Sequence, residues 1–334
     1  MATTTTSLTV RRAIPRAMSS TAAALTSPLV SPRWLKDNMS KSEVKILDSS
    51  WHMPLLKRSG PAEFLKRRIP TSQFFDIDAV CDKASNMPHM LPTPSDMCLA
   101  LADLGVEEGD TVVCYDATGI FAAPRLWWMC SCLRINDTMP ITPVVLDGGL
   151  NAWIASGGEV ESGERLAAVE KGVRIAESAG VATYDASRIS NFDDVRRAVD
   201  DGQANVQVVD ARSAGRFGGT EPEPRPGLPS GHAPGSLNVP FSSLLVSAET
   251  PDGDKYTTMA PVEDLKARFD AAGVSKVGKP LVFSCGTGVT ACTLALATEL
   301  VAAESGMPAV PWSVYDGSWS EYASMPDAPI ATTE

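Results

Sequence analysis

A cysteine in a glycine-rich loop is the part of this sequence best suited to covalent chemistry. The loop reads Ser284-Cys285-Gly286-Thr287-Gly288-Val289-Thr290, between an apolar run typical of a strand and an apolar run typical of a helix. Unpaired N–H groups at a helix N-terminus favour negative charge and lower the pKa of a nearby thiol. Glycines at positions 286 and 288 let the backbone turn tightly, so that successive amides form an anion-binding nest. The pattern predicts that Cys285 reacts as a thiolate nucleophile, the alternative being an inert buried cysteine at a strand end.

The elements that position this loop belong to a unit that occurs twice. Residues 44–48 resemble residues 206–210, each a short apolar run that ends in an acid, and residues 111–115 resemble residues 280–284. Continuous apolar strands that alternate with helical stretches indicate parallel sheets covered on both faces. The sequence therefore predicts an α/β protein of two tandem domains, each a parallel sheet flanked by helices.

The two copies also set the predicted domain boundaries. We place the first domain at about 37–159 and the second at about 187–331. Between them, at about 160–186, lies a linker that contains several glycines and charged residues. Aligning Gly119 with Gly288 puts Asp116 opposite Cys285. Because an aspartate lacks the sulfur of a cysteine, we expect the first domain to be non-catalytic and the second to be catalytic.

Several motifs resemble the rhodanese-like sulfurtransferases, and most closely the mercaptopyruvate sulfurtransferases among them. The resemblance covers about 44–330, and the motifs that carry it are 285–292, 215–217, 221–225, 231–235 and 315–319, with 75–78 and 89–92 in the first domain. It implies two tandem rhodanese-like domains and an enzyme that moves sulfur from 3-mercaptopyruvate, through a persulfide on Cys285, to a thiol or cyanide, with release of pyruvate. Such covalent catalysis in two half-reactions implies ping-pong kinetics. The resemblance implies no cofactor and no metal, and it implies an acceptor such as thioredoxin or a small dithiol.

The resemblance also assigns the residues that bind the donor. Arg216 and Arg225 match the family's substrate arginines, and guanidinium groups suit planar carboxylates. The alternative is that both arginines pair only with Glu221 and Glu223 nearby. Thiosulfate-specific members place basic side chains inside the loop, whereas positions 286 and 287 here carry no charge. We therefore expect 3-mercaptopyruvate as the donor, with thiosulfate as the main alternative and a non-catalytic binding module as a further one.

The other loop residues complete the predicted site. Thr287 is expected to donate a hydrogen bond to the keto oxygen or the departing enolate, unless its hydroxyl bonds the loop backbone instead. The remaining residues expected to surround the substrate are Gly286, Gly288, Val289 and Thr290. Some members are proposed to relay a proton through a histidine that precedes Ile-Pro, and this sequence has Arg68 at that position. The relay is therefore not carried over.

Composition argues against several other classes of function. A net charge of −11 disfavours a nucleic-acid-binding protein, and with no run of eighteen apolar residues we expect no membrane span. The seven cysteines form no pair of CxxC motifs, so no structural zinc site is expected. Ala291 stands where Cys-x5-Arg phosphatases require an arginine, which disfavours phosphate chemistry.

The first 36 residues differ in composition from the rest. They are rich in Ser, Thr and Ala, and they contain no acid and five basic residues: Arg11, Arg12, Arg16, Arg33 and Lys36. This composition is typical of an organellar transit segment, the alternative being an ordinary disordered N-terminus. We predict a mitochondrial location, with plastid or cytoplasm as alternatives.

Overall fold

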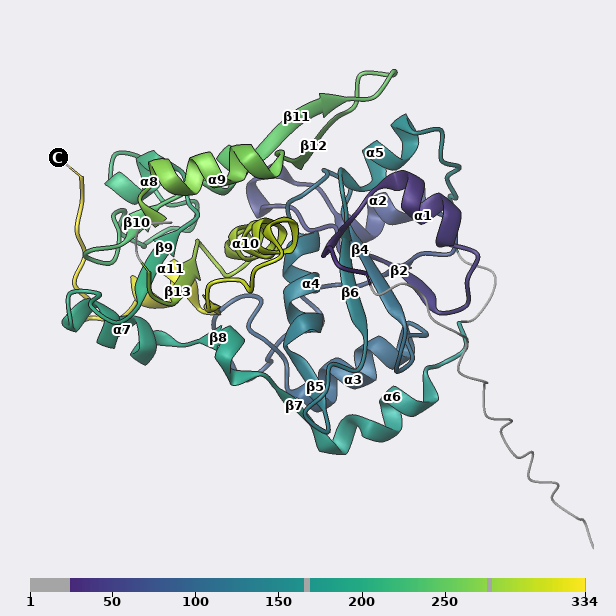
Figure 1. Cartoon of the computed structure of the whole chain (residues 1–334), viewed down its shortest axis with the longest axis horizontal. Coiled ribbons are helices and arrows are strands. Elements are labelled where there is room, and N and C mark those ends of the chain that lie inside the picture. Colours follow the sequence, from purple (N-terminus) through teal and green to yellow (C-terminus); the bar gives the residue numbers. More distant parts are fainter. Residues whose placement is uncertain (1–24, 165–168, 275–277, 334) are drawn as a thin grey trace, which may run out of the picture.

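Two five-stranded parallel sheets form the frame of the protein, one in each half of the chain. A computed structural model describes residues 25–164, 169–274 and 278–333, and Figure 1 shows the two α/β units side by side. The strand order is β1-β6-β4-β2-β3 in the first sheet and β10-β9-β13-β14-β8 in the second. Every neighbouring pair in both orders is parallel. The predicted α/β protein with two tandem units is confirmed.

The strands are short and apolar. Those of the first sheet are β1 (Leu29–Val30), β2 (Val44–Asp48), β3 (Gln73–Phe74), β4 (Thr111–Tyr115) and β6 (Thr142–Leu146). Those of the second sheet are β8 (Ile189–Ser190), β9 (Gln207–Asp210), β10 (Leu237–Asn238), β13 (Leu281–Ser284) and β14 (Trp312–Tyr315). The central strands β9, β13 and β14 are buried along their whole length. Burial on both faces is why these strands appear in the sequence as continuous apolar runs.

Helices flank both sheets. The first unit contains α1 (Pro32–Asn38), α2 (Gly60–Lys66), α3 (Pro94–Asp103), α4 (Ala123–Cys132) and α5 (Gly149–Ala155). The second contains α7 (Phe192–Asp200), α8 (Ala214–Gly218), α9 (Val262–Ala271), α10 (Ala291–Ser305) and α11 (Ser318–Tyr322). Local sequence fixes several helix starts, since Ser31 and Thr93 each accept an N–H of the first turn and are followed by a proline. Within the described residues, no helix is both long and apolar enough to cross a membrane.

The two units share a core and a hairpin. Helix α4 of the first unit packs against α10 of the second, and the Trp127 and Trp312 rings stack with centroids 6.1 Å apart. The antiparallel hairpin of β11 (Leu245–Glu249) and β12 (Lys255–Met259) reaches from the second unit to the first. The Thr257 N–H donates to the Thr118 carbonyl at 3.1 Å. These contacts hold the units in one arrangement, with the catalytic loop near their interface.

The segment predicted as a linker runs along the first unit. It contains α6 (Val173–Glu177) and β7 (Ala182–Tyr184), and β7 pairs antiparallel with β5 (Leu133–Ile135). Residues 165–168 of the predicted linker lie outside the described residues. The pairing of β7 with β5 therefore attaches this segment to the first unit before the chain continues to β8.

The first unit begins earlier than the boundary predicted at residue 37. Strand β1 pairs with β6, and α1 buries Leu35 completely in the core. Strand β1 and most of α1 therefore lie within residues 1–36, the segment predicted as an organellar transit segment, and that assignment stays a prediction. Residues 1–24 of this segment lie outside the described residues.

Candidate active site

Cys285 is the first residue after β13, in the loop that leads to helix α10. Ser284 is the last residue of the strand and pairs with Asp210 of β9, and α10 starts at Ala291. Only 2% of the Cys285 surface is exposed. A cavity of about 490 Å³ opens onto this residue. The thiol is therefore shielded from bulk solvent but accessible to a small molecule.

The cavity is lined by both units. From the second unit it receives six of the predicted site residues besides Cys285: Arg216, Arg225, Gly286, Thr287, Val289 and Thr290. Gly288, also predicted, does not line it. From the first unit it receives Trp51, Met53, Pro54, Leu55 and Phe121. The first unit thus supplies an apolar wall to a site whose nucleophile belongs to the second.

The loop backbone turns its carbonyls away from the cavity. The Trp319 N–H donates to the Cys285 carbonyl and the Ser320 N–H to the Gly286 carbonyl, both at 3.0 Å. In the described part of the chain, no protein acceptor takes the N–H groups of residues 286–290. Unpaired amides around a sulfur atom favour its anionic form and any anion bound to it.

The two loop glycines are required by close contacts. Gly288 has a φ of +74°, and a Cβ added there would lie 2.6 Å from the Asp316 carbonyl oxygen and 2.8 Å from Arg125 Nη1. A Cβ added at Gly286 would lie 3.0 Å from Arg216 Nη2. Gly288 therefore shapes the loop from outside the cavity, whereas Gly286 leaves room for Arg216.

The first unit contains a second loop of this kind, with an aspartate in place of the cysteine. Asp116 directly follows β4, whose last residue Tyr115 pairs with Asp48 of β2. One Asp116 carboxylate oxygen accepts the N–H groups of Phe121, Ala122 and Ala123 at 2.9, 2.9 and 3.0 Å. The amides of this loop thus hold a built-in anion where the second unit has a thiol.

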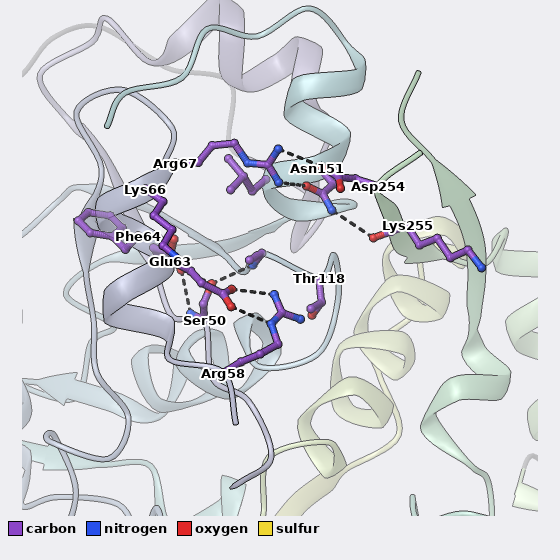
Figure 2. A pocket seen from close by; sticks show the side chains of 13 residues that line it. Ser50, Arg58, Glu63, Phe64, Lys66, Arg67, Thr118, Asn151, Asp254 and Lys255 are labelled. Atoms are coloured by element: carbon purple, nitrogen blue, oxygen red, sulfur yellow. Dashed lines mark hydrogen bonds and ion pairs between the residues drawn. The ribbon is translucent and has the colours of Figure 1, made fainter. Parts of the chain in front are cut away.

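A second cavity, of about 500 Å³, lies at the same edge of the first sheet (Figure 2). Its arginines are paired: Arg58 with Glu63 at 2.7 Å, and Arg67 with Asp254 at 2.9 Å. Burial raises the pKa of Asp48 at its floor to about 7. This cavity has no cysteine among its described lining residues.

The arginines of the cavity at Cys285 differ in their partners. Arg216 forms a two-point ion pair with Glu223, Nε to Oε1 at 3.1 Å and Nη2 to Oε2 at 2.5 Å. Glu223 also binds Arg212 Nη1 at 2.8 Å, and Arg212 is further paired with Asp210. Glu221, in contrast, accepts a hydrogen bond from Ser213 Oγ. Of the two acids considered as partners of Arg216, Glu223 therefore pairs with it and Glu221 does not.

Arg225 is the guanidinium in the cavity that lacks a counterion. Among the described residues it has no ion-pair partner, whereas Arg212 and Arg216 have theirs. Apart from Cys285, three guanidinium groups face two carboxylates, Asp210 and Glu223, so one arginine has no carboxylate partner among the described residues. Burial lowers the pKa of Arg225, and the nearby Cys285 opposes that shift. A half-buried, uncompensated cation is a binding site for one negative charge.

Thr287 and the residues outside the loop have distinct surroundings. Thr287 is buried and lines the cavity, and its hydroxyl has no protein partner in the described chain.

Arg68 lies outside the cavity. It donates to the Gly163 carbonyl at 2.7 Å, and its guanidinium lies 5.0 Å from the centre of the Phe64 ring. It anchors the linker segment and does not line the cavity.

One buried residue near the loop has no signal in the sequence. Arg125 of α4 is fully buried, donates to the Gly288 carbonyl at 3.2 Å and pairs with Asp316 at 2.7 Å. It stands in a Trp-rich stretch that indicates only a buried helix. No local pattern could have linked it to a loop 163 residues away.

Comparison with known proteins agrees with the geometry. The model of the rhodanese-like domain matches residues 31–156 and 191–325. The chain is 38% identical over 329 residues to "Thiosulfate/3-mercaptopyruvate sulfurtransferase 1, mitochondrial" of Arabidopsis thaliana, covering 95% of this chain and 81% of the relative. It is 37% identical to the 3-mercaptopyruvate sulfurtransferase of Rattus norvegicus, over 88% of this chain and 91% of the relative.

Solved structures give the same result. The crystal structure of the Tum1 protein from Saccharomyces cerevisiae superposes with a TM-score of 0.75 at 32% identity, over 92% of this chain and 99% of that one. SseA of Escherichia coli, described as a 3-mercaptopyruvate sulfotransferase of the rhodanese fold, gives 0.70 at 31% identity, over 88% and 99%.

Proposed function

The chain belongs to the rhodanese-like sulfurtransferase family, and we propose that it transfers sulfur from 3-mercaptopyruvate, through a persulfide on Cys285, to a thiol or cyanide. The curated relatives at 34–38% identity are named for this donor. The second unit is proposed as the catalytic domain, about 187–331, and the first as the non-catalytic domain. The first starts by Leu29 rather than at 37 and extends to about 159, with 160–186 as the connection.

In the first half-reaction the Cys285 thiolate attacks the sulfur of 3-mercaptopyruvate. A bond forms between Cys285 Sγ and that sulfur, and the bond between the sulfur and C3 of the donor breaks. The electron pair of the broken bond stays on the three-carbon fragment, which leaves as the enolate of pyruvate and takes up a proton at C3. The free amides of residues 286–290 stabilise the anionic sulfur before and after the transfer.

The uncompensated charge of Arg225 is the single observation that carries the choice of donor. 3-Mercaptopyruvate has one carboxylate, which matches the one arginine of the cavity without a carboxylate partner among the described residues. Arg216, held in place by Glu223, presents its remaining N–H groups beside Gly286. We assign the two arginines to the donor carboxylate, and Gly286, Val289 and Thr290 to the surrounding wall. Gly288 acts from behind the loop.

Thr287 is proposed as the donor of a hydrogen bond to the keto oxygen. Its hydroxyl has no protein partner in the described residues and lines the cavity. Negative charge develops on this oxygen as the enolate leaves, so a hydrogen bond there is stronger in the transition state than in the bound donor. Arg68 takes no part, and solvent or substrate supplies the proton.

In the second half-reaction an acceptor thiolate attacks the outer sulfur of the persulfide. The new bond joins the acceptor sulfur to the transferred sulfur, and Cys285 leaves as a thiolate. We propose a protein dithiol such as thioredoxin, or a small dithiol, as acceptor. The apolar wall of Trp51, Met53 and Leu55 at the cavity supports an acceptor that is partly apolar around its thiol.

Thiosulfate is a second donor that a specific observation favours. Two curated relatives from Arabidopsis thaliana carry both donors in their names. Thiosulfate has two negative charges, whereas one arginine of the cavity lacks a carboxylate partner among the described residues and the loop has no basic side chain at 286 or 287. We therefore propose thiosulfate as the weaker donor.

The test compares kcat/KM for the two donors in one preparation with the same acceptor. We expect pyruvate release from 3-mercaptopyruvate and a kcat/KM at least about tenfold above that for thiosulfate, since a tenfold ratio requires only about 1.4 kcal/mol of differential transition-state binding. Cys285→Ser should abolish both activities. A higher kcat/KM for thiosulfate would make thiosulfate the preferred donor. No turnover of either donor would favour the alternative of a non-catalytic binding module.

We propose a mitochondrial location, with plastid and cytoplasm as the alternatives. The name of one Arabidopsis thaliana relative includes the word mitochondrial. The targeting segment must end before Leu29, because β1 belongs to the first sheet. A fluorescent fusion of residues 1–28 tests this assignment, and a diffuse cytosolic signal would contradict it.

A further inference from the structure

Arg125 joins the non-catalytic unit to the catalytic loop. Its side chain is fully buried, and its guanidinium lies 4.5 Å from the Trp128 ring on the same helix. Nη1 donates to the Gly288 carbonyl at 3.2 Å. Nη2 lies 2.7 Å from an Asp316 carboxylate oxygen and donates to the His89 carbonyl. Arg125 therefore binds two groups of the second unit, the Gly288 carbonyl and the Asp316 carboxylate, and one group of its own unit, the His89 carbonyl.

The contact with Gly288 determines where the next amide points. In a trans peptide the C=O and the following N–H lie in one plane and point in opposite directions. The Gly288 oxygen accepts from Arg125 Nη1 and from Cys292 Sγ, each at 3.2 Å, and the Val289 N–H is therefore directed to the opposite side of that peptide. Val289 lines the cavity, and its N–H has no protein acceptor in the described chain. Fixing one carbonyl thus keeps one donor of the nest free for an anion.

The charge of Arg125 also acts on the sulfur. Burial by itself lowers the pKa of Arg125, and Asp316, together with Cys292 and Cys285, keeps it above its usual value. The guanidinium is therefore charged in the interior. The charged and titratable groups that influence this region are Arg125 (α4), Asp316 (after β14) and Cys292 (α10), together with Arg212, Arg216, Glu223 and Arg225 at the cavity and Asp78 of the first unit.

Asp316 balances this charge from the second unit. Its carboxylate accepts the Leu91 N–H of the first unit at 2.8 Å and pairs with Arg125. Removing Arg125 leaves a buried carboxylate without its counterion near the thiol, whereas removing the Asp316 charge leaves the guanidinium unopposed. The two changes therefore have opposite electrostatic effects on Cys285.

We propose that Arg125 is a positioning residue of the Cys285 loop, supplied by the first unit, which directs the Val289 amide and places a positive charge near Cys285. The proposal rests on the proposed function in that Cys285 is the nucleophile. It gives the first unit a part in the reaction beyond lining the cavity.

The test measures alkylation of Cys285 by iodoacetamide as a function of pH, with the modified peptide quantified by mass spectrometry. At neutral pH, Arg125→Met should slow alkylation of Cys285 severalfold, because a positive charge near the thiol is lost, and Asp316→Asn should accelerate it. Asparagine keeps an oxygen for the Leu91 N–H, so that contact is preserved. Arg125→Lys keeps the charge but not the planar set of donors, so Cys285 should be alkylated at about the wild-type rate while single-turnover pyruvate release slows.

A matched control separates electrostatics from general damage to the interface. Arg67→Met removes another ion pair between the units, with Asp254 at 2.9 Å, away from the loop. It should leave the alkylation profile of Cys285 unchanged. Equal shifts in Arg67→Met and Arg125→Met, or no shift in either, would overturn the proposal.

The Asp316→Asn variant keeps the proposal testable if Arg125→Met does not fold. Unchanged or slower alkylation of Cys285 in Asp316→Asn would contradict the electrostatic role of this pair. Because alkylation requires no sulfur donor, this experiment is independent of substrate. Failure of the wild type to release pyruvate would refute the proposed function and leave the alkylation result interpretable.

Discussion

Asp116 and Cys285 occupy the same position in the two units, each directly after the central strand of a parallel sheet. The Asp116 carboxylate accepts three backbone N–H groups at 2.9–3.0 Å. In the second unit Cys292, the counterpart of Ala123, donates its N–H to the Val289 carbonyl at 3.3 Å, whereas the N–H groups of residues 286–290 have no protein acceptor in the described chain. The comparison identifies the loop as an anion nest within a single molecule, filled by a carboxylate in one copy and open to a sulfur anion in the other.

Replacing Arg225 should separate the two donors. Arg225→Ala removes the uncompensated charge, so kcat/KM for 3-mercaptopyruvate should fall by about 10- to 100-fold, as expected for a lost hydrogen bond to a charged group. Thiosulfate use should fall less, and Arg216→Ala should behave similarly. Arg196→Ala, on the exposed face of α7, is the control. Equal losses for both donors would argue against carboxylate binding.

Neutralising Glu223 should shift preference toward the dianion. Glu223→Gln removes one negative charge from the cavity and frees Arg216 from its two-point ion pair. The ratio of kcat/KM for thiosulfate to that for 3-mercaptopyruvate should increase severalfold. Glu221→Gln is the matched control, because Glu221 binds Ser213 rather than an arginine. A ratio that moves the other way would show that Glu223 does not set the charge of the site.

The loop should not tolerate a side chain at position 288. In Gly288→Ala the new Cβ meets the Asp316 carbonyl oxygen at 2.6 Å, in addition to the strain of φ +74°. Persulfide formation in a single turnover should slow at least about tenfold, as for other displacements of a catalytic loop. Gly157→Ala is the control, since Gly157 has a φ of +77° and no described atom within 4 Å of an added Cβ. Similar rates for both variants would remove the role assigned to this close contact.

Asp48 should make stability depend on pH. Burial raises its pKa to about 7 in the folded protein, whereas an unfolded aspartate titrates near pH 3.9. Between these values the folded state binds the extra proton, so the free energy of unfolding should decrease as pH rises from about 4 to 7.

Asp48→Asn cannot ionise and should lack this decrease. Urea titrations at pH 5 and pH 8 should show the variant gaining about 1–4 kcal/mol on the wild type at the higher pH. Parallel changes in the two proteins would mean that Asp48 is ionised at both pH values.

The sequence was sufficient for the repeat and for the position of the glycine loop between a strand and a helix. The nucleophilic role of Cys285 and the non-catalytic role of the first unit stay predictions. These features are local, so that residue type and spacing determine them. The predicted alignment of Gly119 with Gly288 agrees with the strand register of both sheets.

Other features depend on contacts that spacing does not reveal. Arg125 acts on a backbone carbonyl 163 residues away, and a carbonyl has no sequence signature. Glu223 serves Arg212 and Arg216 at once, which leaves Arg225 free, and only the folded arrangement distinguishes it from Glu221. Strand β1 has two residues, too few to show any periodicity, so the first unit was predicted to start too late.

The central claim is that Cys285 carries the transferred sulfur. The direct measurement mixes enzyme with one equivalent of 3-mercaptopyruvate and no acceptor, and follows pyruvate and the mass of the Cys285 peptide together. We predict one pyruvate per active site and one extra sulfur atom on Cys285, lost again when a dithiol is added. Pyruvate released without that mass change, or the extra sulfur on another cysteine, would contradict the mechanism.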